Sequence, residues 1–152
     1  SDTISLAALT EEVFCDLDPV AEKHQVRLIQ TDGDCTVTGS YILLYRAVYN
    51  LVENAIKYNR PSGSVTVSIH SAESAVLEVT DTGIGISPEN QEKIFDPFYR
   101  VDKSRSRAMG GAGLGLALVS EIARQHNGQV KVTQSSEKGS TIALILPELT
   151  DY

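Results

Sequence analysis

Apolar residues recur at three- and four-residue spacing in three separate stretches of the chain, and each stretch predicts an amphipathic helix. The first runs from Leu6 to His24, the second from Ser40 to about Tyr58, and the third from Leu114 to Asn127. Pro19 lies inside the first stretch and predicts a kink or a new turn, because proline lacks the N–H that an inner helical residue donates. Gly128 follows the third stretch and predicts a left-handed helix cap.

Short segments with period-two alternation predict strands at 26–30, 35–38, 65–70, 75–81, 129–133 and 141–146. Ser87-Pro88-Glu89 is typical of a helix start. From Asp96 to Ala112 no periodicity survives, which predicts a long mobile loop. The mixed order of helices and strands predicts an α+β two-layer sandwich, with three main helices covering a mixed, mostly antiparallel sheet.

Composition narrows the class of protein. The 152 residues are enough for one domain with a sizeable core. The net charge of −7 disfavours a general nucleic-acid or acidic-membrane binder. Two cysteines, Cys15 and Cys35, are too few for a disulfide framework or a tetrahedral zinc site. No apolar run approaches the ~18 residues of a membrane span, and the abrupt helical start suggests a piece of a longer protein.

One polar stripe stands out on the second predicted helix. At ~100° per residue, Asn50, Asn54 and Lys57 fall on one side, with Glu53 beside them. A carboxamide oxygen is a neutral, hard ligand that suits Mg²⁺, and a lysine ammonium suits phosphate. A solvated helix face would carry the same residues, so the stripe alone leaves both interpretations open.

Asp81 ends a predicted strand in which Leu77 and Val79 share its face. If that face is buried, the carboxylate needs hydrogen-bond donors, and an exocyclic amine such as N6 of adenine is a suitable one. Gly83 and Gly85 follow, where a ligand could approach the backbone closely. The alternative is a simple turn residue at the end of a strand.

The glycine-rich segment 110–116 directly precedes the third predicted helix. Free N–H groups and the helix dipole make such a start an anion site, and phosphate is its usual occupant. The spacing matches neither a P-loop nor a dinucleotide-binding fingerprint, whereas a plain flexible hinge remains an alternative. The preceding segment is rich in cations, which favours a phosphate-facing lid: it contains Arg100, Lys103, Arg105 and Arg107 against Asp96 and Asp102.

Four motifs together resemble the N, G1, F and G2 boxes of bacterial two-component sensor histidine kinases, in the family's order and spacing. They are Asn50-x-x-x-Asn54-Ala55-x-Lys57-Tyr58, Asp81-x-Gly83-x-Gly85, Phe95-x-Pro97-Phe98-Tyr99-Arg100 and Gly111-x-Gly113-Leu114-Gly115-Leu116. The resemblance implies the ATP-binding Bergerat fold of the GHKL superfamily, shared with gyrase, Hsp90 and MutL. It also implies that 1–152 is a single catalytic ATP-binding domain with a lid at about 96–112, without the dimerisation, phosphoacceptor and sensor domains.

The same resemblance implies which residues surround ATP and Mg²⁺. Asn50, Asn54 and Lys57 would serve catalysis, with Asn54 as the metal ligand. Asp81 would accept the adenine amino group, and Thr141 would supply a hydroxyl on the adenine side. The full implied set is Asn50, Asn54, Lys57, Tyr58, Asp81, Gly83, Gly85, Ile86, Tyr99, Arg100, Lys103, Gly111, Gly113, Leu114, Gly115, Leu116 and Thr141.

Two positions depart from the family's pattern. Ala112 stands where the G2 box often has a hydroxyl residue, which removes a possible polar contact but leaves the backbone site intact. Asn59 stands where Thr or Ser is common, and we expect little consequence from it.

The chemistry at Asn50 separates kinase from ATPase. Related ATPases carry a Glu there as general base, and a carboxamide is not a useful base near neutral pH, so hydrolysis should be slow. Transfer to an incoming nucleophile fits better. His24, His70 and His126 lack phosphoacceptor surroundings. The resemblance therefore implies transfer to a histidine on a separate dimerisation domain, and no autophosphorylation of this chain alone.

The implied partners are that dimerisation domain and a downstream response regulator, with neither nucleic acid nor direct membrane contact. The implied location is the cytoplasm, as part of a bacterial membrane receptor. Two alternatives remain at this point: a GHKL-type ATPase, such as a clamp or DNA-repair relative, and a degenerate binding module of the same fold that holds a partner without nucleotide.

Overall fold

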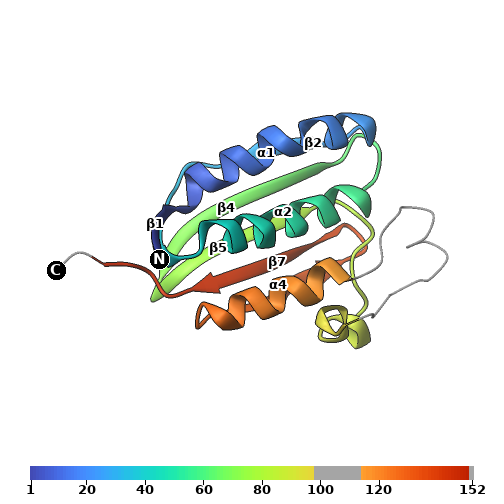
Figure 1. Cartoon of the computed structure of the whole chain (residues 1–152). Coiled ribbons are helices and arrows are strands. Elements are labelled where there is room, and N and C mark those ends of the chain that lie inside the picture. Colours follow the sequence, from blue (N-terminus) through green and yellow to red (C-terminus); the bar gives the residue numbers. More distant parts are fainter. Residues whose placement is uncertain (98–113, 151–152) are drawn as a thin grey trace.

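In the computed structural model, which describes residues 1–97 and 114–150, three helices lie over one face of a five-stranded sheet (Figure 1). The helices are α1 (Leu6–Lys23), α2 (Tyr41–Lys57) and α4 (Leu114–Gln125). The middle helix, α2, contacts both of the others. The prediction of an α+β two-layer sandwich is confirmed.

The main sheet has the strand order β2-β4-β5-β7-β6, and only β2 and β4 pair in parallel. A second, two-stranded sheet pairs β1 with β3. The strands are β1 (Asp2–Ser5), β2 (Arg27–Gln30), β3 (Thr36–Gly39), β4 (Ser64–Ala72), β5 (Ser74–Asp81), β6 (Gln129–Ser136) and β7 (Gly139–Leu146). Two short 3₁₀ turns follow β5: η1 (Pro88–Asn90) and η2 (Lys93–Phe95).

The helix α2 forms where its capping and apolar spacing predict it. The Ser40 hydroxyl accepts the Leu43 N–H at 3.2 Å and so caps the helix start. One apolar stripe of this helix is buried against the sheet and the neighbouring helices: Leu44, Ala47, Val48, Leu51, Val52, Ala55 and Ile56. This stripe leaves the opposite polar positions of α2 at the surface.

The inner face of β5 supplies the sheet's contribution to the core. Ala75, Leu77 and Val79 are at most 2% exposed, whereas the residues between them are more exposed. Alternation therefore aims Asp81, the last residue of β5, towards the helical layer. The end of β5, the end of α2 and the beginning of α4 lie at the same end of the sheet, away from the N-terminus (Figure 1).

The helix α1 shows no break at Pro19, and one expectation at the end of α4 differs from the structure. The helix α1 continues through Pro19, since Pro19 and Cys15, four residues earlier, are both exposed and water can reach the unpaired carbonyl. The left-handed residue after α4 is Asn127 (φ 59°), not Gly128. Gly128 instead passes close to β7, where a Cβ would lie 2.1 Å from the Ile145 carbonyl oxygen.

The strand β1 was not expected from the sequence, because its four residues show little alternation. Its pairing with β3 supplies the reason that it is extended. The predicted loop 96–112 lies outside the described residues from 98 onward. None of the helices in the described residues combines the length and the apolar composition needed to cross a bilayer.

Candidate nucleotide-binding site

The polar stripe on α2 is present as predicted. Asn50, Asn54 and Lys57 are all half-buried on this helix. Lys57 Nζ lies 3.9 Å from Glu53 Oε2, one helical turn earlier, which restrains the ammonium on this side of α2. Among the described residues, the side chains of Asn50 and Asn54 form no hydrogen bond, which leaves both carboxamides available to a ligand.

Asp81 accepts hydrogen bonds from the turn that follows β5 and from the neighbouring strand β7. Its Oδ1 accepts the N–H of Gly83 at 2.9 Å and the N–H of Ser140 at 3.2 Å. Its Oδ2 accepts the Ser140 hydroxyl at 3.0 Å. An ionised carboxylate has about four acceptor positions, so this one retains capacity for a further N–H donor.

Burial raises the pKa of Asp81 above the ordinary aspartate value, while the hydrogen bonds from Gly83 and Ser140 act in the opposite direction. Three donors therefore hold the carboxylate in place, but they do not fully offset the cost of burying its charge. An amino group on a planar base would supply a further donor, so the carboxylate suits the amino group of adenine.

The hydroxyl beside Asp81 belongs to Ser140, one residue before the expected Thr141. Strand register decides this: Ser140 pairs with Asp81, whereas Thr141 pairs with Thr80. The Thr141 hydroxyl lies 2.9 Å from the Thr80 hydroxyl. Because side chains alternate along β7, that contact is on the sheet face opposite to Asp81.

The glycines after Asp81 are required by the chain's own packing. A Cβ on Gly83 would lie 2.4 Å from the Tyr58 carbonyl oxygen. A Cβ on Gly85 would lie 1.9 Å from the Ser136 carbonyl oxygen, and Gly85 also has φ 77°. In the described structure, the space beside both glycines is thus filled by backbone of α2 and β6.

The segment that follows is anchored to β6 and to the hydrophobic core. The N–H of Ile86 donates to the Ser135 hydroxyl at 2.7 Å, and Gln91 Nε2 donates to the Ile86 carbonyl at 3.0 Å. Ile94 in η2 is 4% exposed and belongs to the hydrophobic core. These contacts hold the chain between the G1 motif and residue 97 against the body of the domain.

The remaining predicted contacts are only partly described. Tyr99, Arg100, Lys103, Gly111 and Gly113 lie outside the described residues. Leu114 and Gly115 begin α4, and Leu116 is 6% exposed in the core. The C-cap of α2 is Tyr58, which is half-buried.

No group of three or more His, Cys, Asp or Glu residues within 1–97 and 114–150 could hold a metal ion. Mg²⁺ usually keeps several waters and is bound by few protein groups together with substrate phosphates. A site built on one carboxamide, such as that of Asn54, fits this chemistry.

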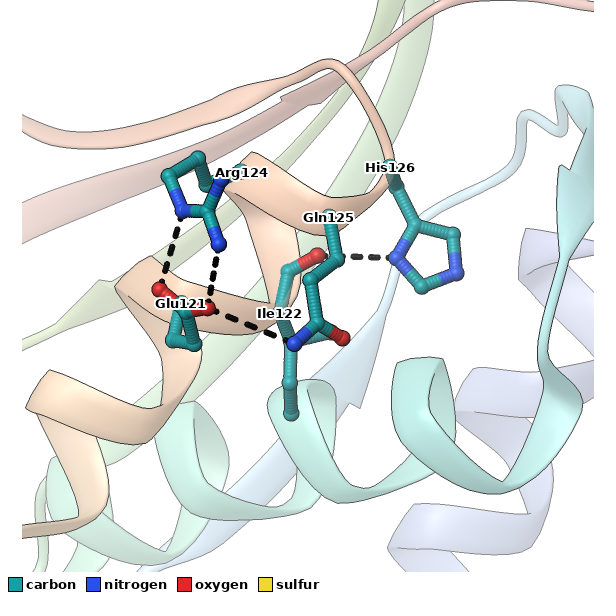
Figure 2. Close-up of polar contacts among 5 residues, drawn as sticks. All are labelled: Glu121, Ile122, Arg124, Gln125 and His126. Carbon is teal, nitrogen blue, oxygen red and sulfur yellow. Dashed lines mark hydrogen bonds and ion pairs between the residues drawn. The ribbon is translucent and has the colours of Figure 1, made fainter.

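The histidines are engaged in structural contacts. Figure 2 shows His126 at the end of α4, where its Nδ1 lies 2.8 Å from the Ile122 carbonyl oxygen. Its Nε2 accepts the Ser40 N–H at 3.1 Å, so the ring joins the end of α4 to the start of α2. His24 Nδ1 lies 2.9 Å from the Val20 carbonyl oxygen, and His70 Nδ1 lies 3.5 Å from Glu78.

The arrangement defines a class of protein. A helix bearing two carboxamides, a half-buried aspartate at a strand end and the beginning of α4 lie at one end of an α/β sandwich, as in a nucleotide-binding domain. Residues 39–150 match the model of the histidine kinase-, DNA gyrase B- and HSP90-like ATPase family, and the chain belongs to this family. The predicted resemblance is confirmed, and with it an ATP-binding domain of the sensor-kinase type.

Sequence relatives place the chain among sensor kinases. It is 39% identical to the sensor-like histidine kinase SenX3 of Mycolicibacterium smegmatis over 153 aligned residues, covering 99% of this chain and 40% of that protein. It is 44% identical to the sensor histidine kinase RppB of Synechocystis sp. over 140 residues, covering 91% of this chain and 30% of that protein. The chain thus spans well under half the length of these curated relatives.

Solved structures of sensor histidine kinases have the same fold as this chain. The mycobacterial sensor histidine kinase MprB superposes with a TM-score of 0.86 at 27% identity, with 99% of this chain and 100% of that chain covered. The catalytic domain of histidine kinase ThkA superposes with a TM-score of 0.80, and its 23% identity shows the shared fold.

Proposed function

We propose that this chain binds Mg²⁺-ATP and donates the γ-phosphoryl group to a histidine on the dimerisation domain of a sensor histidine kinase. A response regulator would then receive the phosphoryl group. The observation that carries the proposal is the Asp81 carboxylate, held by three donors and still able to accept an adenine amino group. The parent protein would be a bacterial receptor with this domain in the cytoplasm, where ATP is available.

The residues take distinct roles in this proposal. Asp81 orients the base, with Ser140 in the position that we had expected for Thr141. Asn54 holds Mg²⁺ through its side-chain oxygen, with Asn50 beside it to position the metal or the phosphates. The metal neutralises phosphate charge when it is bound. Lys57 contacts the phosphates while it stays beside Glu53, whose Oε2 lies 3.9 Å from its Nζ.

Transfer is favoured over hydrolysis because the stripe offers no free base. Asn50 cannot accept a proton near neutral pH. Glu53, the carboxylate of this stripe, lies 3.9 Å from Lys57, so it serves as an ion partner and has at most a supporting role. The attacking group must therefore bring its own activation, while this chain supplies positioning and electrostatic stabilisation.

Calorimetry with a non-hydrolysable ATP analogue, with and without Mg²⁺, tests the proposal. The wild-type chain should bind the analogue more tightly with Mg²⁺, and Asn54→Ala should lose most of that gain while retaining metal-free binding. Absence of binding to the wild-type chain would favour a degenerate module instead. Fast hydrolysis by the isolated chain would favour a GHKL-type ATPase.

Phosphoryl transfer requires a second assay. Incubation with γ-labelled ATP should leave the isolated chain unlabelled, because His24 and His126 are engaged in structural contacts and none of the three histidines has phosphoacceptor surroundings. Addition of the parent protein's dimerisation domain should produce acid-labile label on that domain. Stable label on a histidine of this chain would contradict the assignment.

A further inference from the structure

Four residues join the end of α2, the beginning of β4 and the turn after β5. They are Asn59, Gly63, Ser64 and Thr82, here called the Asn59 clasp. None of the four is among the residues assigned to the nucleotide site: Asn59 directly follows Tyr58 of the N-box motif, and Thr82 is the unspecified residue between Asp81 and Gly83. The comparison with the family's pattern predicts little consequence from Asn59.

Asn59 uses both ends of its carboxamide. Its Nδ2 donates to the Ser64 carbonyl at 2.9 Å. Its Oδ1 accepts the Arg60 N–H at 2.8 Å and the Thr82 hydroxyl at 3.0 Å. A hydroxyl residue at this position is shorter and cannot supply a donor and a double acceptor at such a separation.

Thr82 completes the clasp from the other side. Its hydroxyl oxygen accepts the Ser64 N–H at 2.9 Å, and its own N–H donates to the Ser64 carbonyl at 3.2 Å. The threonine therefore continues the β4–β5 pairing by one more residue and ties it to α2 through Asn59.

Gly63 makes this close approach possible. A Cβ at this position would lie 2.2 Å from Asn59 Oδ1 and 2.6 Å from Thr82 Oγ1. Any larger residue would separate the two hydrogen-bonding partners. Glycine is therefore needed here because a side chain would not fit, and not because the backbone adopts a positive φ.

The clasp lies between the two halves of the proposed site. Asn59 follows the helix that carries Asn54 and Lys57, and Thr82 directly follows Asp81. Gly83, the next residue, is packed so closely on the Tyr58 carbonyl that a Cβ would lie 2.4 Å from it. A shift of the turn relative to α2 would therefore change the distance from Asp81 to the carboxamide stripe.

We propose that the Asn59 clasp is a positioning element that sets the spacing between the base-binding aspartate and the phosphate-binding stripe, and so controls ATP affinity without touching the nucleotide. The inference rests on the proposed function of the site. The physical reason is that a ligand bound at both ends responds steeply to a sub-ångström change in the span between its contacts.

The test is calorimetric binding of a non-hydrolysable ATP analogue with Mg²⁺, at a temperature where each variant is shown to be folded by circular dichroism. Thr82→Val removes the hydroxyl at nearly constant volume and should raise Kd about 3- to 10-fold. Thr82→Ser keeps the hydroxyl and should restore a Kd close to that of the wild type. Thr38→Val, on the exposed surface of β3, is the matched control and should bind as the wild type does.

A second variant tests the other end. Asn59→Asp keeps the acceptor oxygen for Thr82 but loses the donor to the Ser64 carbonyl, so Kd should again rise. A double-mutant cycle of Thr82→Val and Asp81→Asn distinguishes a positioning role from a merely structural one, because it measures whether the effect of Thr82 on Kd depends on Asp81. If Thr82 acts through Asp81, Thr82→Val should add less than about a twofold change in Kd in the Asp81→Asn background.

The outcomes are distinguishable. If the wild-type chain fails to bind the analogue, the proposed function falls and the inference with it. If the wild type binds and Thr82→Val and Asn59→Asp bind equally well, only the clasp is refuted. An equal loss of affinity in Thr82→Val and Thr82→Ser would also refute the clasp. So would a double variant in which the separate increases in Kd from Thr82→Val and Asp81→Asn multiply.

Discussion

Asp81→Asn should weaken ATP binding without weakening the fold. An asparagine side chain can replace the carboxylate atom for atom: its oxygen accepts the N–H groups of Gly83 and Ser140, and its amide donates to the Ser140 hydroxyl. Only the interaction with an incoming amino group is lost, because an amide NH₂ faces another donor there.

The magnitude follows from the loss of one hydrogen bond to a charged acceptor, about 1–3 kcal/mol, or about a 5- to 140-fold rise in Kd. The free energy of unfolding should not fall in this variant and should rise at neutral pH. Burial raises the pKa of Asp81, so the folded state favours the protonated acid. That stabilisation is fully present below the ordinary pKa of about 4 and is lost as pH rises through the raised value. At neutral pH the ionised carboxylate therefore carries a cost that the asparagine removes.

The assay pairs calorimetry with urea unfolding of the same preparations. At pH 7, Asp81→Asn should have an unfolding free energy equal to or above that of the wild type, and this gap should narrow below about pH 4. Inosine triphosphate, which has an oxygen in place of the adenine amino group, gives a second readout. The wild type should prefer the ATP analogue strongly, and the variant should lose most of that preference.

Asp18→Asn is a suitable control, because it removes the same charge from an exposed position of α1. It should leave nucleotide affinity unchanged. An unchanged Kd for the ATP analogue in Asp81→Asn would remove Asp81 from the site. A variant that is clearly less stable at pH 7 would show that the carboxylate is needed for folding rather than for the ligand.

Three further outcomes are expected. Glu53→Gln, which breaks the contact with Lys57, should leave the slow ATP hydrolysis of the isolated chain unchanged, and a fast turnover abolished by this change would contradict the account of a poor hydrolase. Gly85→Ala should lower the unfolding free energy in urea by about 1–3 kcal/mol, because φ is 77° and the new Cβ would overlap a carbonyl of β6. Burial raises the pKa of Cys35 to about 11, so iodoacetamide at pH 8 should modify Cys15 in the folded chain and Cys35 only after denaturation, as mass spectrometry would show.

The secondary structure was largely readable from local patterns. The three main helices begin and end close to the predicted residues, because apolar periodicity and capping residues such as Ser40 act within a few positions of one another. Alternation alone predicted that Asp81 shares the face of Leu77 and Val79, and the structure shows that this face is the buried one. The helix through Pro19 shows the limit of such rules, since an exposed proline inside the pattern does not end α1.

The partners across the sheet were not readable in this way. Register between β5 and β7 decides that Ser140 rather than Thr141 meets Asp81, and a shift of one residue exchanges the faces of a strand. Likewise β1 is extended only because β3, more than thirty residues later, pairs with it. Neither pairing can be predicted from the hydrophobic pattern within a single strand.

The sequence by itself determined the chemical inventory of this protein: two carboxamides and a lysine on one helix, an acid at a strand end, and glycines before a helix. These depend on residue type and short-range spacing. Only the tertiary structure decided how the inventory is spaced, through contacts such as that of Asn59 with Thr82, 23 positions away. The physical reason is that hydrogen bonds and close packing between distant segments exist only once the sheet and its helical layer have assembled.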